Sequence, residues 1–102
     1  MAKLLAMYKR PADPAAFERY YFTTHVPLAK TIPGLVSYEV TRGPIMSLEG
    51  PAEYHLIATL TFSSMAAIRA ALTSPQGQAV AADLANFATA GVALLFADST
   101  TI

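Results

Sequence analysis

The amino-acid sequence predicts an α+β fold, in which helices cover one face of an antiparallel β-sheet. Two observations lead to this prediction. Runs of apolar or alternating apolar and polar residues, typical of strands, occur near both ends and in the middle of the chain. Segments with helical periodicity and capping residues lie between them. With 102 residues the chain has room for one hydrophobic core, so one domain is expected over residues 1–102.

The first part of the chain predicts a strand followed by a helix. Residues 3–9 are a short apolar run that ends at the turn-forming sequence KRPADP. Asp13 and Pro14 then supply an N-cap and a proline at the first helical position, where the missing N–H costs no hydrogen bond. Pro27 disfavours helical backbone at the residue before it, so the helix is expected to end near His25.

Three more strands are expected in the rest of the chain. Residues 35–42 and 54–62 alternate between apolar and polar side chains, which is typical of strands with one buried face. The segment that joins them, GPIMSLEGPAE, is expected to be a loop. Residues 92–97 are continuously apolar, so we expect both faces of this last strand to be covered.

Two helical segments are expected between the last two strands. Ser63 or Ser64 can cap the first, in which Met65, Ile68 and Leu72 form the apolar stripe. The second begins at Ser74–Pro75 and carries Val80, Leu84 and Phe87 on its apolar stripe. The resulting order, β-α-β-β-α-β with an extra helical segment, is the split β-α-β or ferredoxin-like pattern.

One face of the predicted sheet has no helix to cover it. It would carry the residues Ser37, Glu39, Thr41, His55, Ile57, Thr59 and Thr61, beside side chains of the two apolar outer strands. Since 54% of the residues are apolar, more than a core of this size needs, we expect this face to pack on a second copy of the chain. The polar groups on it would then line a small cavity between the two sheets.

Charge and composition exclude several classes of function. The net charge is zero and the seven basic residues are scattered singly, so nucleic acid is not expected as a partner. Cysteine is absent, which excludes disulfides, thiolate metal sites and cysteine nucleophiles. The N-terminus does not resemble a signal peptide and no apolar run is long enough to span a membrane. We therefore expect a cytoplasmic protein without a membrane partner.

Motifs for metals and cofactors are missing from the sequence. The two histidines lie thirty residues apart and are not paired with other ligands in a metal-binding spacing. Glycine-rich dinucleotide, P-loop and serine-hydrolase motifs are absent as well. His25 is compatible with an axial haem ligand without being diagnostic of one. No cofactor and no metal are therefore expected.

Four stretches of the sequence together resemble the EthD family of dimeric α+β barrels: FERYYFTTHVPLAKTIPGL, YHLIATLTFSS, SPQGQAVAADLANFA and GVALLFADS. They cover nearly the whole chain. In the family's pattern an aromatic pair precedes H-x-P-L-A and then P-G-L, and the matching residues are Tyr20, Tyr21, His25, Pro27, Leu28, Ala29, Pro33, Gly34 and Leu35. The resemblance implies a ferredoxin-like monomer, a barrel-forming homodimer and a pocket in each subunit.

For function the resemblance implies a range of activities. The family was named for an accessory gene product of ether degradation, and it is similar to muconolactone isomerases and to fungal polyketide-tailoring decarboxylases and dehydratases. Many members carry a generic reductase label. No motif in this sequence supports that label, because a nucleotide-binding signature is absent.

His25 has two interpretations. A basic group near the carboxyl end of a helix stabilises the fold by ~0.3–1 kcal/mol, with no further role. Histidine is also the usual general acid or base. Phe17, Tyr21 and His25 recur every four residues, so the imidazole would lie on the buried stripe of its helix, beneath the sheet. His25 is therefore the candidate catalytic residue.

Five other residues are candidates for the pocket or binding site. Tyr8, Tyr21 and Tyr38 are expected to be core aromatics whose hydroxyl groups could line a pocket for a flat apolar ligand. Glu39 and His55 are expected on the same sheet face, on consecutive strands. They are either an ordinary cross-strand pair or a carboxylate that holds an imidazole for proton transfer.

Two functions fit these observations. The first is a cofactor-independent enzyme that transfers protons on a small, apolar carbonyl, enol or lactone compound, as an isomerase, lyase or dehydratase. The second is a non-catalytic binding or accessory protein of a degradation pathway, which would hold an apolar metabolite in the same cavity. The sequence does not separate the two.

Overall fold

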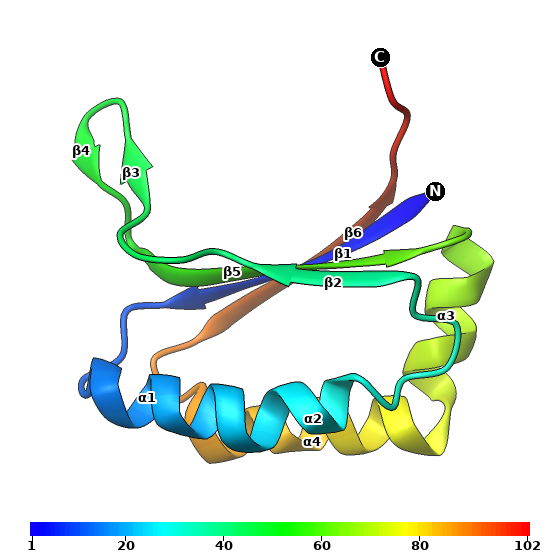
Figure 1. Cartoon of the computed structure of the whole chain (residues 1–102), viewed down its shortest axis with the longest axis horizontal. Coiled ribbons are helices and arrows are strands. Elements are labelled where there is room, and N and C mark those ends of the chain that lie inside the picture. The colour runs from blue at the N-terminus through cyan, green and yellow to red at the C-terminus, as the bar shows by residue number, and fades with distance from the viewer.

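The structure is a computed structural model that describes all residues from Met1 to Ile102. A layer of helices covers one face of a β-sheet (Figure 1). The elements in chain order are β1 (Ala2–Lys9), α1 (Pro14–Tyr20), η1 (Tyr21–His25), α2 (Val26–Ala29), β2 (Ser37–Val40), β3 (Met46–Ser47), β4 (Gly50–Pro51), β5 (Tyr54–Phe62), α3 (Met65–Thr73), α4 (Pro75–Phe87) and β6 (Val92–Asp98). None of the helices combines the length and apolar character that a membrane span requires.

The main sheet has the strand order β2-β5-β1-β6, and every neighbouring pair is antiparallel. The two central strands, β1 and β5, are the first and third long strands of the chain, which is the ferredoxin-like arrangement. The predicted fold class is therefore confirmed. The segment expected to be a loop after β2 instead contains a short hairpin, β3–β4, which projects from the side of the sheet opposite the helices (Figure 1).

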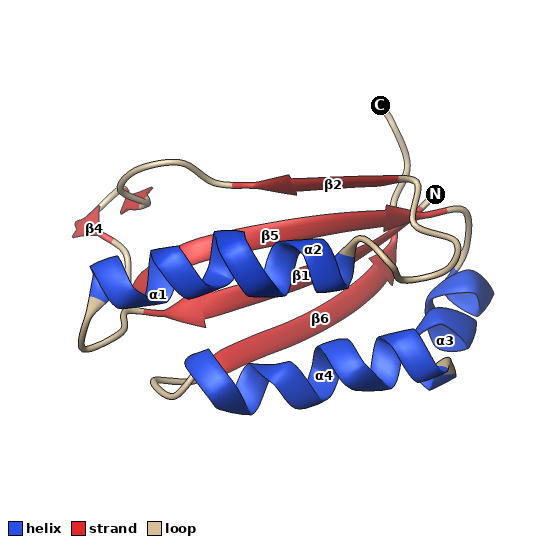
Figure 2. Cartoon of the chain, turned by 60° about the horizontal axis from the view of Figure 1, so that its bottom comes forward, coloured by secondary structure: helices blue, strands red, loops and turns tan.

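The two faces of the sheet differ in their cover. On β1 the residues Ala2, Leu4, Ala6 and Tyr8 are buried beneath the helices, while the three residues between them are half-buried on the open face. Figure 2 shows that the α1–α2 segment and α4 run side by side across the covered face. The open face carries apolar side chains that no element of this chain covers.

The last strand is less covered than its continuous apolar sequence predicts. β6 is an edge strand, paired on one side with β1. Three of its large apolar side chains are exposed by 41–54%: Leu94, Leu95 and Phe96. Within the chain itself, the expectation that both faces of this strand are covered is wrong, because the helices reach only part of one face.

Helical backbone continues past His25, so the expectation that the helix ends there is also wrong. α1 passes into the π-helical turn η1, in which the Val26 N–H donates to the Tyr21 carbonyl, and then into α2, where Pro27 occupies an early position. A π-turn widens the helix by one residue, and such turns are frequent at functional sites. A proline is tolerated in the first turn of a helical segment, because its missing N–H has no partner there.

The caps predicted for the helices are present. Asp13, Ser64 and Ser74 each accept a hydrogen bond from a backbone N–H three residues on, at 3.0–3.1 Å. Gly77, in the first turn of α4, lies very close to α3: a Cβ built on it would come within 2.0 Å of the Ala71 carbonyl oxygen. Only glycine permits this close approach of the two helices, which brings α4 over the sheet.

An aromatic cluster fills the core at one end of the sheet. Tyr8 on β1 packs against Phe17, Tyr21 and Phe87, with ring centroids 5.5–5.6 Å apart. Each of these four rings is at least 93% buried. The cluster joins the sheet, the α1–η1 segment and α4, and it fixes the position of the helical turn that carries His25.

Candidate functional site

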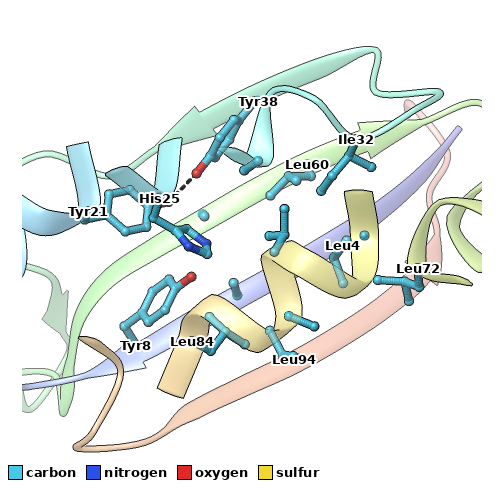
Figure 3. A pocket seen from close by; sticks show the side chains of 16 residues that line it. Leu4, Tyr8, Tyr21, His25, Ile32, Tyr38, Leu60, Leu72, Leu84 and Leu94 are labelled. Atoms are coloured by element: carbon cyan, nitrogen blue, oxygen red, sulfur yellow. Dashed lines mark hydrogen bonds between the residues drawn. The ribbon is translucent and has the colours of Figure 1, made fainter. Parts of the chain in front are cut away.

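A small cavity of about 60 Å³ lies between the sheet and the helices (Figure 3). Of its 16 lining residues, four carry polar side-chain groups, namely Tyr8, Tyr21, His25 and Tyr38. The others are aliphatic residues or glycine from both sheet and helices. The cavity has room for a few water molecules or for the polar part of a ligand. It lies on the helical side of the sheet, away from the open face.

His25 is held by a buried carboxylate. Its Nδ1 atom lies 2.8 Å from Oδ2 of Asp83 on α4, and only 3% of His25 and 7% of Asp83 is exposed. The other carboxylate oxygen of Asp83 accepts hydrogen bonds from the Tyr20 hydroxyl at 2.6 Å and from Asn86 Nδ2 at 3.0 Å. His25 is thus not a solvated group at a helix end, and the interpretation as a simple helix-end charge is wrong.

The protonation of Asp83 determines the tautomer of His25. Burial disfavours the carboxylate, but the hydrogen bonds from Tyr20, Asn86 and His25 outweigh burial and lower the pKa of Asp83 below its ordinary value of 3.8. At neutral pH Asp83 is therefore ionised, and an ionised carboxylate can only accept hydrogen bonds. The Nδ1 atom of His25 must then carry a proton. Nε2 has no partner within the chain, so it is the nitrogen left for a ligand in the cavity.

Three tyrosine hydroxyls accompany His25. The hydroxyls of Tyr21 and Tyr38 are 2.6 Å apart, and either can donate to the other. Because one of them is the donor, the proton of the other is free to point into the cavity. Tyr8 has no hydrogen-bond partner in the chain, and Figure 3 shows its hydroxyl directed into the same space.

These hydroxyls stay protonated at physiological pH. Burial is the largest cause that raises the pKa of Tyr8 and of Tyr21 well above the ordinary value of 10, and the neighbouring Tyr38 raises both further. Burial also raises the pKa of Tyr38. A phenol that keeps its proton can donate a hydrogen bond to a ligand oxygen. The structure therefore brings an imidazole and hydroxyl donors together at one cavity.

Glu39 and His55 do not belong to this group, nor do they meet each other. Glu39 is exposed on the open face, where its strand partner is Thr59. The pairing of β1 with β5 shifts register beside His55, so its ring turns to the helical side, where it contacts Phe17 and lies 3.2 Å from Glu18. The expected Glu39–His55 pair is thus wrong, because a simple two-residue alternation does not anticipate this bulge.

Asp83 and its partners Tyr20 and Asn86 were not anticipated as site residues. One signal for Asp83 was present in the sequence: it falls within the stripe of α4 formed by Val80, Leu84 and Phe87. A carboxylate on an apolar helical stripe must find a partner when it is buried. The sequence did not show which cation or hydrogen-bond donor would be the partner of Asp83, since His25 lies 58 residues away from it in the chain.

We predict that Asp83→Asn removes a pH-dependent contribution to stability. Because the pKa of Asp83 is lower in the folded protein, its contribution is complete above the ordinary value of 3.8 and is lost as the pH falls through the folded pKa. Urea unfolding should show the variant less stable by about 1–3 kcal/mol near neutral pH, with a smaller difference at about pH 2.5. Asp98→Asn, at an exposed carboxylate without a partner, is the control. A difference that does not change with pH would contradict this account of Asp83.

Comparison with solved structures of low sequence identity supports the fold alone. A dimeric ferredoxin-like protein of unknown function from Jannaschia sp. is 20% identical with a TM-score of 0.67, and the match covers 96% of this chain and 98% of that chain. SnoaB, a cofactor-independent oxygenase from Streptomyces nogalater, is 18% identical with a TM-score of 0.67, over 99% of this chain and 94% of that chain.

Two more similar proteins and a family model identify the family. An uncharacterized 11.0 kDa protein in the thcB-thcC intergenic region of Rhodococcus erythropolis is 43% identical over 103 residues, which cover 100% of this chain and 98% of that protein. The crystal structure of an EthD family protein from Bacillus halodurans is 32% identical with a TM-score of 0.90, and the match covers 98% of this chain and 99% of that chain. The model of the EthD domain matches residues 9–91. The chain therefore belongs to the EthD family.

Proposed function

We propose that this protein is a cofactor-independent enzyme that transfers protons on a small apolar carbonyl, enol or lactone compound, with His25 as the general acid and base. One observation carries the proposal: a buried carboxylate holds Nδ1 of His25, which leaves Nε2 for a ligand in a cavity that tyrosine hydroxyls also line. An imidazole oriented by a carboxylate is the arrangement that general acid–base catalysis uses repeatedly.

The reaction would begin when Nε2 of His25 removes a proton from the carbon next to the carbonyl group. The negative charge then moves to the carbonyl oxygen, where the hydroxyl of Tyr8 and that of Tyr21 or Tyr38 can donate hydrogen bonds. The protonated imidazole returns the proton either to another carbon, which completes an isomerisation, or to a leaving group, which completes an elimination. Both reactions balance without an oxidant or a metal.

Asp83 would act as a positioning residue. Its carboxylate fixes the ring orientation and stabilises the imidazolium that forms when Nε2 takes up a proton. Tyr20 and Asn86 hold the carboxylate in turn. Because the surrounding walls are aliphatic, an apolar ligand that fills the cavity would displace water, which would strengthen each of these electrostatic interactions.

The similarity to SnoaB supports this proposal only in that the same fold occurs in a protein that works without a cofactor. That protein is described as a cofactor-independent oxygenase.

A competing function is that of a non-catalytic binding or accessory protein. The mainly aliphatic wall of the cavity favours this function, since carriage of an apolar metabolite needs no acid or base.

We also propose that the protein is a homodimer that pairs through the open sheet face. Leu5, Met7, Ile57 and Leu95 are uncovered on this face, and the register places them on adjacent strands. A contiguous apolar patch of this kind is uncommon on a monomeric protein. The fold neighbour from Jannaschia sp. is described as dimeric, which supports a dimer but does not identify the face that pairs.

The catalytic proposal predicts that His25→Ala loses proton transfer. The assay follows exchange of the α-protons of 2-hexanone with D₂O by NMR, which requires proton abstraction but not the natural substrate. The exchange rate should fall by ~10²–10⁴-fold in the variant. Loss of a hydrogen bond to buried Asp83 should also lower the free energy of unfolding by about 1–3 kcal/mol, more than a solvated helix-end histidine would.

The matched control is His55→Ala, which removes the other histidine, outside the cavity. It should exchange protons at the rate of the parent protein. If the parent protein accelerates no exchange, or if the folded His25→Ala variant exchanges protons as fast as the parent, the catalytic proposal is wrong and the binding function is favoured.

The proposed pairing through the open sheet face predicts that the Ile57→Lys variant is monomeric. The substitution would place an unpaired charge in the buried interface, where it is costly. Light scattering at micromolar concentration should give a dimer for the parent protein and a monomer for the variant. Ala85→Lys, at an exposed site on α4, should remain dimeric. A monomeric parent protein, or a dimeric Ile57→Lys variant, would refute pairing through this face.

A further inference from the structure

We propose that the ligand of this cavity is a neutral carbonyl compound with an unbranched aliphatic chain, because the lining changes from polar to apolar along the length of the cavity. The carbonyl head would lie at His25 and the chain at the opposite, aliphatic end. The identity of the head group rests on the proposed function. The place and nature of the chain rest on the shape and lining of the cavity.

The polar lining residues lie together at one end of the cavity, and the opposite end is lined by apolar residues alone. Figure 3 shows Tyr8, Tyr21, His25 and Tyr38 grouped at one end, while Leu4, Ile32 and Leu72 lie at the other. The first group comes from β1, the η1 turn and β2, and the second includes the loop after α2 and the end of α3. A ligand with one hydrogen-bonding end and one apolar end satisfies both groups at the same time.

The width of the cavity favours a chain over a ring system. The cavity encloses about 60 Å³, which is too little for a fused aromatic ligand unless packed side chains move. The lining runs along β1 from Leu4 to Tyr8, over about 13 Å of strand, so this small volume is spread along a narrow passage rather than gathered in a wide slot. An unbranched chain is thin enough to lie along such a passage, and the part of it that this volume does not hold would extend out of the cavity.

Charge in the lining favours a neutral head group. None of the 16 lining residues is a lysine, an arginine, an aspartate or a glutamate. The nearest carboxylate, Asp83, lies behind His25 and already accepts three hydrogen bonds. A carboxylate head would have no cation to pair with other than a protonated His25, whereas a carbonyl oxygen needs only the tyrosine donors.

Aliphatic lining residues also mark where the cavity meets the surface. Leu72 is 36% exposed and Leu94 is 48% exposed, although both line the cavity. These side chains border an apolar mouth, through which a chain longer than the enclosed space can extend. The cavity therefore limits the length of the ligand's alkyl chain less strictly than it limits the width and the polarity of the ligand.

The test measures binding of a homologous series, 2-butanone, 2-hexanone, 2-octanone and 2-decanone, to the unmodified protein by ligand-observed NMR. Affinity should rise by ~4-fold for each added methylene until the chain leaves the apolar wall, as expected for burial of a methylene group. At equal carbon number, 2-decanone should bind at least tenfold more tightly than 1-tetralone, a fused-ring ketone. Equal or tighter binding of 1-tetralone, or affinity independent of chain length, would overturn the proposal.

Variants locate the chain and separate this proposal from the catalytic one. Leu72→Gln should weaken binding of 2-octanone and leave 2-butanone unchanged, while Leu48→Gln, at a fully exposed residue of the β3–β4 hairpin, should change neither. An unchanged 2-octanone affinity in folded Leu72→Gln protein would contradict the placement of the chain. His25→Ala should weaken all four ketones by a similar factor and keep the dependence on length. If the parent protein shows this dependence without proton exchange, catalysis is refuted and the chain site stands.

Discussion

The hydrogen bond between His25 and Asp83 is the interaction on which the candidate site depends. It joins the π-helical turn after α1 to the middle of α4, two segments that lie 58 residues apart in the sequence. Because both groups are more than 90% buried, neither is tolerable alone in this place. The pair thus fixes the distance between the two helices and at the same time directs the second nitrogen of the imidazole to the cavity.

The rest of the architecture supports this pair from both sides. Tyr20 and Asn86 complete the hydrogen bonds of the carboxylate, while the rings of Tyr21 and Phe87 enclose the imidazole at centroid distances of 5.5 and 4.6 Å. Gly77 allows α4 to begin against the end of α3. A polar network and a close helix contact at glycine thus position one histidine. A charge interaction at a helix end would need neither of them.

Much of the fold could be predicted from the sequence because local rules govern it. The N-caps at Asp13 and Ser64 and the bounds of β5 follow from residue types and from apolar periodicity. The helix through His25 could not be predicted in this way. The rule that proline disfavours helix at the preceding residue is a statistical one, and here the π-turn rearranges the backbone hydrogen bonds so that Pro27 begins a new helical segment.

The candidate site was predictable only in part for a similar reason. The buried stripe of the first helix placed His25 and Tyr21 correctly, and Tyr8 and Tyr38 lie with them. Asp83 could not be identified as the partner of His25, since contacts between segments that are distant in the chain leave no local pattern in the sequence. For His55 the local pattern misled, because one shift in strand register turned the ring to the other face.

The tautomer of His25 tests the central claim most directly, and long-range proton–nitrogen NMR correlation spectra of the imidazole measure it. If an ionised Asp83 holds the ring as described, the neutral form of His25 carries its proton on Nδ1, and addition of 2-hexanone shifts the Nε2 resonance more than that of Nδ1. A neutral ring with its proton on Nε2, or a ligand response confined to Nδ1, would contradict the claim that Asp83 presents Nε2 of His25 to the cavity.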